Sequence, residues 1–180
     1  MGLDSYFTKK IYVGAQYEHR NVTGNINIFV GGKKLDVDFS KVSQIEEAFG
    51  YWRKANAIHR WFVESVQDGE DNCKEYLVDE YDMKNLLALC NKVLEESVLI
   101  DGKLFAGTSY SKGVGTKIWE DGKVISNPEI ADALLPTGEG FFFGGTGYDE
   151  WYIKDLEYTK ELMEKALACK DGDFYYSSSW

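Results

Sequence analysis

The sequence predicts a single α+β domain in which an N-terminal antiparallel β-hairpin or meander packs with several α-helices. Apolar and polar residues alternate in the hairpin region, residues 8–39, whereas most apolar residues of residues 40–180 recur at helical spacing. Strands that come before a run of helices favour α+β over a parallel α/β sheet. A chain of 180 residues with only two prolines suits one domain without a proline-rich linker. We therefore expect residues 1–180 to form one domain, with a mainly helical body and short strands after the hairpin region.

The hairpin region contains three alternating runs. In the first run, one face holds Ile11, Val13, Ala15 and Tyr17, and the other holds Lys10, Tyr12, Gln16 and Glu18. The second run covers residues 26–30 and the third covers residues 35–39. The Gly-Gly pair between them is a hairpin signal, and the connection through residues 20–25 is looser. The pattern predicts a three-stranded antiparallel meander with one buried face.

Two helices are expected next. In residues 40–50, a serine can cap the helix start, a glutamate can complete a capping box, and Gly50 can end the turn. In residues 51–69, an apolar stripe at helical spacing is formed by Tyr51, Ala55, Ile58 and Phe62. His59 lies on the neighbouring stripe and therefore at the edge of the face that we expect to be buried.

The second half of the chain mixes helices, short strands and turns. We expect, in order, a strand at residues 75–78, a helix at 82–97 capped by Asp82, a glycine-rich loop at 110–126, a short helix after Pro128, a strand at 141–143 and a helix at 149–169. Within the glycine-rich loop, Asp-Gly at 121–122 separates two short apolar runs and would form the turn of a hairpin. The C-terminal tail is aromatic and is expected to dock on the body.

The net charge of −10 is unevenly distributed. The first 60 residues carry nine Lys or Arg against six Asp or Glu, whereas the remaining residues carry 11 against 24. A mildly basic front could face a polyanion and an acidic back could face a basic protein. The alternative is that the acidic surplus only keeps the chain in solution.

No targeting segment is recognised in the sequence. The N-terminus has no apolar core of a signal peptide, no run approaches a membrane span, and the residues after Gly2 do not fit the myristoylation pattern. Cys73, Cys90 and Cys169 are odd in number and lack a CxxC spacing, which favours reduced thiols in a cytoplasmic protein. We expect no membrane partner.

Several familiar catalytic motifs are absent from the sequence. It has no P-loop, no HExxH motif and no GxSxG elbow, and the glycines of residues 138–147 lack the dinucleotide-binding spacing. Carboxylates gather at the start of the last expected helix, at Asp149, Glu150 and Asp155. They favour the helix dipole, and a Mg²⁺ site is the alternative reading. The sequence nominates no metal ligands and leaves the cofactor unknown.

The two histidines are the candidates for acid–base catalysis. Metal-free RNA cleavage needs one group to take the 2′-hydroxyl proton and another to protonate the leaving oxygen, and histidine suits both tasks near neutral pH. His19 stands between Glu18, an orienting carboxylate, and Arg20, a cation for the phosphate. On a strand, Glu18 and His19 would point to opposite faces, so an ordinary polar hairpin end is the competing interpretation. For His59, the competing interpretation is a half-buried helix residue bonded to a neighbour.

Aromatic and basic residues interleave on the hairpin region. These candidates for RNA binding are Lys9, Lys10, Tyr12, Tyr17, Phe29, Lys33 and Lys34. Bases stack on aromatic rings and lysines meet phosphates in single-stranded RNA binding, with about 1–3 kcal/mol for each stacked base. The alternative is ordinary strand propensity of the aromatics together with lysines that protect a sheet edge.

Three blocks of the sequence resemble a family of small proteins carried by phages and mobile elements of Gram-positive bacteria. They are "MGLDSYFTKK" at residues 1–10, "YWRKANAIHRWF" at 51–62 and "LLPTGEGFFFGGTGYDEWYIKDLEYT" at 134–159. The hairpin region resembles the type II anti-CRISPR member of that group. This resemblance implies an inhibitor, in the host bacterial cytoplasm, of the RNA-guided type II CRISPR-Cas effector nuclease. It implies that the single guide RNA is truncated while bound to the effector and that the N-terminal hairpin is required.

The residues themselves leave the source of the chemistry open. No complete ribonuclease constellation is visible, so the cut could use groups lent by the effector. The first alternative is a non-enzymatic acidic inhibitor that blocks the nucleic-acid channel of the effector. A second alternative is a phage accessory protein with another host target, which would use residues 51–62 as its site.

Overall fold

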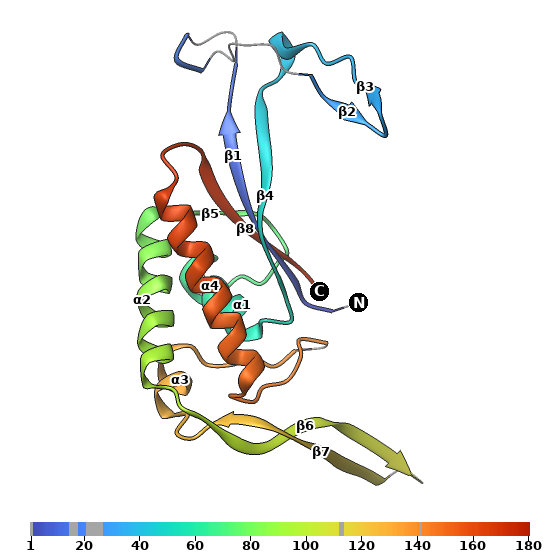
Figure 1. The fold of residues 1–180 in the computed structure, drawn as a ribbon, viewed down its shortest axis with the longest axis vertical. Coiled ribbons are helices and arrows are strands. Elements are labelled where there is room, and N and C mark those ends of the chain that lie inside the picture. The colour runs from blue at the N-terminus through green and yellow to red at the C-terminus, as the bar shows by residue number, and fades with distance from the viewer. Residues whose placement is uncertain (1, 15–17, 21–26, 112–113, 141) are drawn as a thin grey trace.

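The computed structural model describes residues 2–14, 18–20, 27–111, 114–140 and 142–180, and it confirms the α+β fold (Figure 1). Helices pack on one antiparallel sheet to form a body. A β-hairpin lies at each end of the long axis of the molecule (Figure 1).

The main sheet joins segments from both ends of the chain. Its strands are β1 (Asp4–Tyr12), β4 (Gln44–Arg53), β8 (Asp173–Ser179) and β5 (Tyr76–Val78), in the order β4-β1-β8-β5, and all neighbours are antiparallel. Asp4 pairs with Ser179, so the two termini lie side by side (Figure 1). The aromatic tail therefore docks, as expected, and it does so as a strand in the interior of the sheet.

The helix expected at residues 40–50 is not formed, so this prediction is wrong. This segment forms the short 3₁₀ turn η2 (Phe39–Lys41) and then β4. A register shift between Phe7 and Thr8 leaves Phe49 without a partner residue on β1, because Gly50 pairs with Phe7 and Ala48 with Thr8. This β-bulge breaks the period of two that identifies a strand in sequence.

The expected three-stranded meander is not formed either. β1 begins at Asp4 and pairs with β4 and β8, whereas β2 (Phe29–Val30) and β3 (Lys33–Lys34) form a separate hairpin. The Gly-Gly turn of this hairpin is confirmed, since Gly31 and Gly32 both have a positive φ. We call the described residues 13–14, 18–20 and 27–43 the N-terminal arm; it lies beyond the ends of β1 and β4 (Figure 1).

Four helices of the described residues build the body: α1 (Asn56–Ser65), α2 (Glu80–Glu96), α3 (Glu129–Leu134) and α4 (Glu150–Ala168). The cap of α2 is Asp79, three residues before the expected Asp82, whose backbone nitrogen donates to the Asp79 carboxylate at 2.9 Å. The Asp82 carboxylate in turn accepts from the backbone nitrogen of Asp79 at 3.1 Å, and this pair of hydrogen bonds forms a capping box. None of the helices in the described part of the chain is long and apolar enough to cross a membrane.

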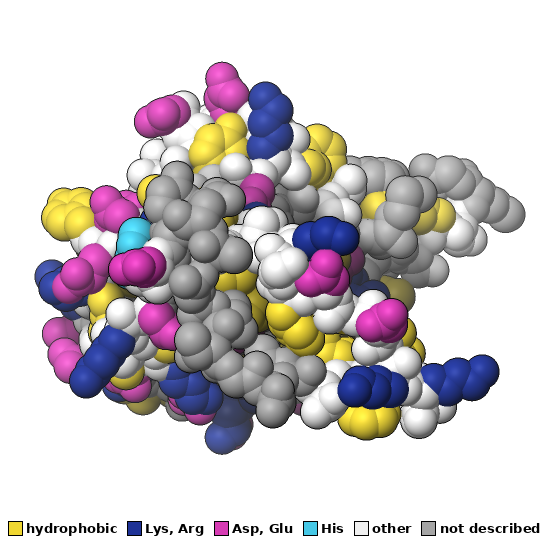
Figure 2. All heavy atoms as spheres, turned by 90° about the horizontal axis from the view of Figure 1, so that it is seen from above, with side chains coloured by type: hydrophobic (Ala, Val, Ile, Leu, Met, Phe, Trp, Pro, Cys, Tyr) yellow, Lys and Arg dark blue, Asp and Glu magenta, His cyan; other side chains and the backbone are white. Residues whose placement is uncertain are grey.

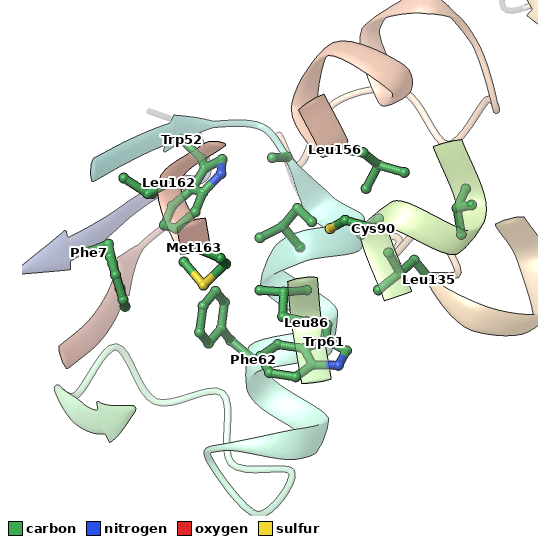
Figure 3. Close-up of a cluster of buried hydrophobic side chains, with 14 of the residues drawn as sticks. Phe7, Trp52, Trp61, Phe62, Leu86, Cys90, Leu135, Leu156, Leu162 and Met163 are labelled. Atoms are coloured by element: carbon green, nitrogen blue, oxygen red, sulfur yellow. The ribbon is translucent and has the colours of Figure 1, made fainter. Parts of the chain in front are cut away.

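The core lies between the sheet and the helices (Figure 3). Phe7 stacks on Phe174 with ring centres 5.1 Å apart, and Phe62 stacks on Tyr176 at 3.9 Å. Leu86 and Cys90 of α2, with Leu156 and Met163 of α4, complete the fully buried centre. The aromatic pairs contribute about 0.5–1.5 kcal/mol each beyond the area that they bury.

The second hairpin consists of β6 (Leu99–Ser111) and β7 (Val114–Ile125). A hairpin is therefore present in the expected glycine-rich loop, but Asp121 and Gly122 lie within β7, opposite Lys103 and Gly102. The strand expected at residues 141–143 is not formed by Phe142 and Phe143, and Phe142 has a positive φ of 65°. Phe141 lies outside the described residues.

Candidate functional site

The three candidates around His19 lie in a 3₁₀ turn, η1 (Glu18–Arg20), and are exposed. The backbone nitrogen of Gly14 donates to the carbonyl of Arg20 at 3.0 Å, which ties this turn to the end of β1. Successive side chains of a 3₁₀ helix project about 120° apart. The turn therefore removes the strict alternation of a strand, but it does not place the three side chains on one face.

The tip of the β2–β3 hairpin presents apolar and basic side chains together. Phe29 pairs with Lys34 and Val30 pairs with Lys33 across the two strands, and Phe29 and Val30 are 61% and 62% exposed. Side chains that are directly opposite in an antiparallel pair share a face. Each face of the tip thus carries one cation beside one apolar group.

The candidates on β1 are held by the body. Lys9 is buried with its ammonium 2.9 Å from the carboxylate of Asp171, and this hydrogen bond raises the pKa of Lys9. Lys10 forms ion pairs with Glu75 and Glu46. Tyr12 shares a hydrogen bond of 2.9 Å with the hydroxyl of Tyr175. A phosphate could reach these lysines only by displacing a carboxylate, and Tyr17 lies outside the described residues.

The face seen from the end of the N-terminal arm is mixed in charge. Figure 2 shows basic, acidic and hydrophobic side chains interspersed among the described residues of this face, and these form no continuous basic patch. In the described part of the arm, Arg20, Lys33, Lys34 and Lys41 stand against Glu18, Asp36 and Asp38. An anionic partner would therefore meet local groups at the tip and not a broad positive field.

His59 lies in a buried hydrogen-bond network that ties α1 to the sheet. Its Nδ1 is 2.8 Å from the Tyr176 hydroxyl and its Nε2 is 3.1 Å from Asp71 Oδ2. The Tyr176 hydroxyl donates to Ser5 Oγ at 2.9 Å, and the indole of Trp180 donates to Asp71 Oδ1 at 2.9 Å. Both ring nitrogens of His59 are thus engaged.

The structure does not bring His19 and His59 into one site. The segment around residues 18–20 belongs to the arm, whereas α1 lies in the body (Figure 1). A pocket of about 300 Å³ borders His59 and is also lined by Arg60, Asp71 and Glu139. Arg60 already donates to Glu64 at 2.7 Å and to the Thr137 carbonyl at 3.2 Å. The two-histidine mechanism is therefore not assembled within this chain.

A glycine-rich loop, residues 138–147, is pinned by one side chain that the sequence did not nominate. Asn56 is 4% exposed. Its amide nitrogen donates to the carbonyls of Phe143 at 3.2 Å and Gly145 at 2.8 Å, and its oxygen accepts from the nitrogen of Gly138 at 3.0 Å. In the sequence, the feature that could have marked this contact is a polar asparagine among apolar residues at the start of a helix, because a polar side chain that becomes buried there needs hydrogen-bond partners.

Beside this loop lies a second pocket, of about 350 Å³, which we call the loop pocket. Its lining includes charged and aromatic residues from the end of β4, from β6 and β7, and from the start of α4: Arg53, Lys54, Phe105, Glu120, Asp149, Trp151, Tyr152 and Asp155. Burial and the nearby Asp149 carboxylate raise the pKa of Asp155 to about 7. A carboxyl group with such a pKa can give or take a proton near neutral pH.

From the sequence, Asp155 is one of three carboxylates near a helix start, for which a Mg²⁺ site is the alternative interpretation. The described residues contain no group of three or more His, Cys, Asp or Glu side chains that could hold a metal ion. Asp149 instead caps α4, because its Oδ1 accepts from the backbone nitrogens of Trp151 at 2.8 Å and Tyr152 at 3.1 Å. The feature of the sequence that could have marked the loop pocket is Asp155, an acidic residue one turn after Tyr152, which lies on the buried side of α4.

Comparisons of the chain with protein-family models, with curated protein sequences and with solved structures found no match.

Proposed function

We propose that this chain is an anti-CRISPR protein that inhibits an RNA-guided type II effector nuclease by inducing truncation of its single guide RNA. The resemblance of the three sequence blocks motivates the proposal. The structural observation that supports it is the tip of the β2–β3 hairpin, where Phe29 lies beside Lys34 and Val30 beside Lys33 at the far end of the arm. An exposed ring next to an ammonium group is the local chemistry that single-stranded RNA uses.

In this proposal the arm holds guide RNA that is already bound to the effector. A base stacks on Phe29, and neighbouring phosphates meet Lys33 and Lys34. Stacking on one ring contributes about 1–3 kcal/mol, which is too little for tight binding by the arm alone. Dependence on the effector follows, because the complex must hold the RNA in place for the arm.

The proposed chemistry is attack of a 2′-hydroxyl on its neighbouring phosphorus. His19 takes the 2′-hydroxyl proton, the 2′-oxygen forms a bond to phosphorus, and the bond from phosphorus to the 5′-oxygen breaks. Arg20 offsets charge on the phosphate. Because His59 is engaged in the body, the proton for the 5′-oxygen comes from a group of the effector complex. Each positioned proton transfer would accelerate the reaction by about 10²–10⁴-fold.

The test is a gel of labelled guide RNA incubated with this protein, with and without the effector. The expected result is a shortened product only when both proteins are present. His19→Ala and Arg20→Ala should reduce the product, and Phe29→Ala should weaken retention of the RNA. Lys41→Ala is a matched control in the same arm, since Lys41 pairs with Asp38 at 3.1 Å. Intact RNA in every tube would reject the proposal.

A non-enzymatic inhibitor is the second candidate, and the acidic surface of two helices favours it. Exposed carboxylates line the outer faces of α2 and α4: Glu80, Glu95, Glu96, Glu157, Glu161 and Glu164. A groove between these helices is lined by three of these glutamates together with Lys160. Such a surface could occupy a basic nucleic-acid channel.

This candidate predicts salt-sensitive binding to the effector with all RNA left intact. The triple variant Glu157→Lys, Glu161→Lys, Glu164→Lys should abolish inhibition if the acidic face acts as a decoy. The same variant should leave RNA truncation in place if the arm acts by cleavage. The remaining alternative, a partner site on residues 51–62, has little support because most of α1 in this block is buried, including Ile58, Trp61 and Phe62.

A further inference from the structure

The loop pocket is lined by two cations, Arg53 and Lys54, that form no direct salt bridge with a carboxylate of the described residues. Among the described residues, neither Arg53 nor Lys54 forms a salt bridge, whereas Lys9, Lys10 and Lys154 all do. Arg53 ends β4, and Lys54 follows it with a positive φ of 62°, an uncommon conformation for a residue with a side chain. A Cβ on Gly144 would lie 3.1 Å from Lys54 Cβ, so the glycine loop packs closely on this lysine. Such backbone strain is often found where a side chain is held for a ligand.

The pocket is also lined by the carboxyl group of Asp155. Only the backbone carbonyl of Asp155 takes part in a side-chain hydrogen bond, from the Thr159 hydroxyl at 2.6 Å. No hydrogen bond to its carboxyl group is found within the described residues. Asp155 is only partly buried, and its carboxyl oxygens reach the pocket, where solvent or a ligand can meet them. Below about pH 7 this carboxyl is protonated and offers a donor and an acceptor side by side.

The rim of the pocket is aromatic. Trp151 is 61% exposed and Phe105 is 50% exposed. The ammonium of Lys154 lies 4.0 Å from the centre of one Trp151 ring, so a cation covers one ring face. The opposite face could stack on a planar ligand. The pocket volume of about 350 Å³ is within the range of small-molecule sites.

We propose that the loop pocket binds a nucleoside phosphate. The phosphate would meet Arg53 and Lys54, and the base would stack at the aromatic rim. The protonated Asp155 carboxyl would donate to adenine N1 or cytosine N3 and accept from the adjacent exocyclic amine. The start of α4 does not compete for the phosphate, because the Asp149 carboxylate already occupies its backbone nitrogens. Guanine and uracil place a ring N–H beside a carbonyl oxygen, and the same carboxyl can accept from the first and donate to the second, so this group does not select among the bases.

The first experiment measures binding of AMP, CMP, GMP and UMP to the full chain by calorimetry at pH 6. All four nucleotides should bind, because each base edge offers the carboxyl a donor beside an acceptor. Adenosine and inorganic phosphate, tested separately, should each bind more weakly than AMP, because each makes only part of the contacts. Absence of binding by all four nucleotides, or binding of inorganic phosphate as tight as that of AMP, would overturn the proposal.

The second experiment assigns the contacts by substitution. Asp155→Ala should weaken AMP binding roughly tenfold or more, whereas Asp155→Asn keeps one donor and one acceptor and should retain it. Lys54→Ala and Arg53→Ala should weaken AMP but leave adenosine unchanged. Glu157→Ala and Lys160→Ala are matched controls on α4, since both residues line the other groove. Unchanged AMP binding in Lys54→Ala, Arg53→Ala and Asp155→Ala, each with an unchanged melting temperature, would place the site elsewhere.

The third experiment uses pH. Besides Asp155, the titratable and charged groups that line the pocket are Arg53, Lys54, Glu120, Asp149 and Tyr152. The AMP affinity of the wild type, relative to Asp155→Asn, should fall about tenfold from pH 6 to pH 8, because the donor is lost as Asp155 ionises. The ratio cancels ionisation of the phosphate itself, and a constant ratio would contradict the assigned role. AMP binding does not depend on guide-RNA truncation, so either proposal can fail while the other stands.

Discussion

At the scale of single residues, Asp155 shows how burial sets a charge state. Its pKa of about 7 lies above the usual 3.8 because the ionised form loses hydration and meets the Asp149 carboxylate. The folded protein therefore holds this proton more tightly than the unfolded chain does. The stabilising contribution is fully present below about pH 4 and is lost as the pH rises towards 7.

We predict that Asp155→Asn stabilises the protein at pH 8. The expected gain in the free energy of unfolding is roughly 1–3 kcal/mol, after allowance for the partial exposure of the group. The gain should vanish at about pH 3, below the ordinary pKa of 3.8, where Asp155 is mostly neutral in both states. Urea titrations of both proteins at the two pH values measure it, and a variant that is less stable at pH 8 would contradict this account.

The buried hydroxyl of Tyr176 contributes to stability through two hydrogen bonds. Tyr176→Phe leaves both His59 Nδ1 and Ser5 Oγ without their partner. We expect a loss of about 1–3 kcal/mol in the free energy of unfolding, since unpaired buried polar groups are costly. Tyr175→Phe on the same strand is the control, because its hydroxyl meets only the Tyr12 hydroxyl in an exposed position. Chemical denaturation of the two variants should separate them clearly.

At the scale of elements, a close approach of β4 and α4 requires a glycine. A Cβ on Gly50 would lie 2.3 Å from a methyl carbon of Leu162, which is buried. Helices and strands pack at this distance only where one partner lacks a side chain.

We predict that Gly50→Ala lowers the free energy of unfolding by about 1–3 kcal/mol through overpacking. Gly145→Ala should be nearly neutral by comparison, because nothing lies within 4 Å of an added Cβ there and the φ of Gly145 is not positive. Thermal denaturation of both variants is the measurement. Equal melting temperatures would show that Leu162 can move aside without cost.

At the scale of the whole molecule, the body and the N-terminal arm differ in what holds them. The body joins both chain ends in one sheet and buries the aromatic core. The tip of the arm consists of two strands of two residues each, and none of these residues is buried. Stability and the proposed RNA contact are therefore located in different parts of the chain.

Two deletions test this division. Removal of residues 173–180 should unfold the protein, since β8 lies between β1 and β5 in the main sheet. Replacement of residues 28–35 by a short glycine–serine turn should leave the melting temperature unchanged and abolish truncation of guide RNA. Near-ultraviolet circular dichroism and the RNA gel give the two readouts. Truncation by the shortened arm would remove the tip from the mechanism.

Local signals in the sequence were sufficient for several elements. The helical spacing of residues 82–97, the start of the last helix near Asp149 and the Gly-Gly turn all depend on neighbours within a few residues, and each is present in the structure. The α+β class follows from the same kind of evidence. The position of the α2 cap was missed by three residues because Asp79 and Asp82 are equally good caps and only the capping box decides between them.

The sequence by itself determined the types of most elements, the acidic surplus and the exposure of Phe29, Lys33 and Lys34. Only the tertiary structure decided that residues 44–53 form a strand, that the tail lies inside the sheet, and that Lys9, Lys10 and His59 are engaged by distant partners. The same is true of the loop pocket, which gathers residues from β4, β6, β7 and α4. The physical reason is that strand pairing, ion pairing and burial join residues far apart in the chain, and no local pattern records which partner each residue meets.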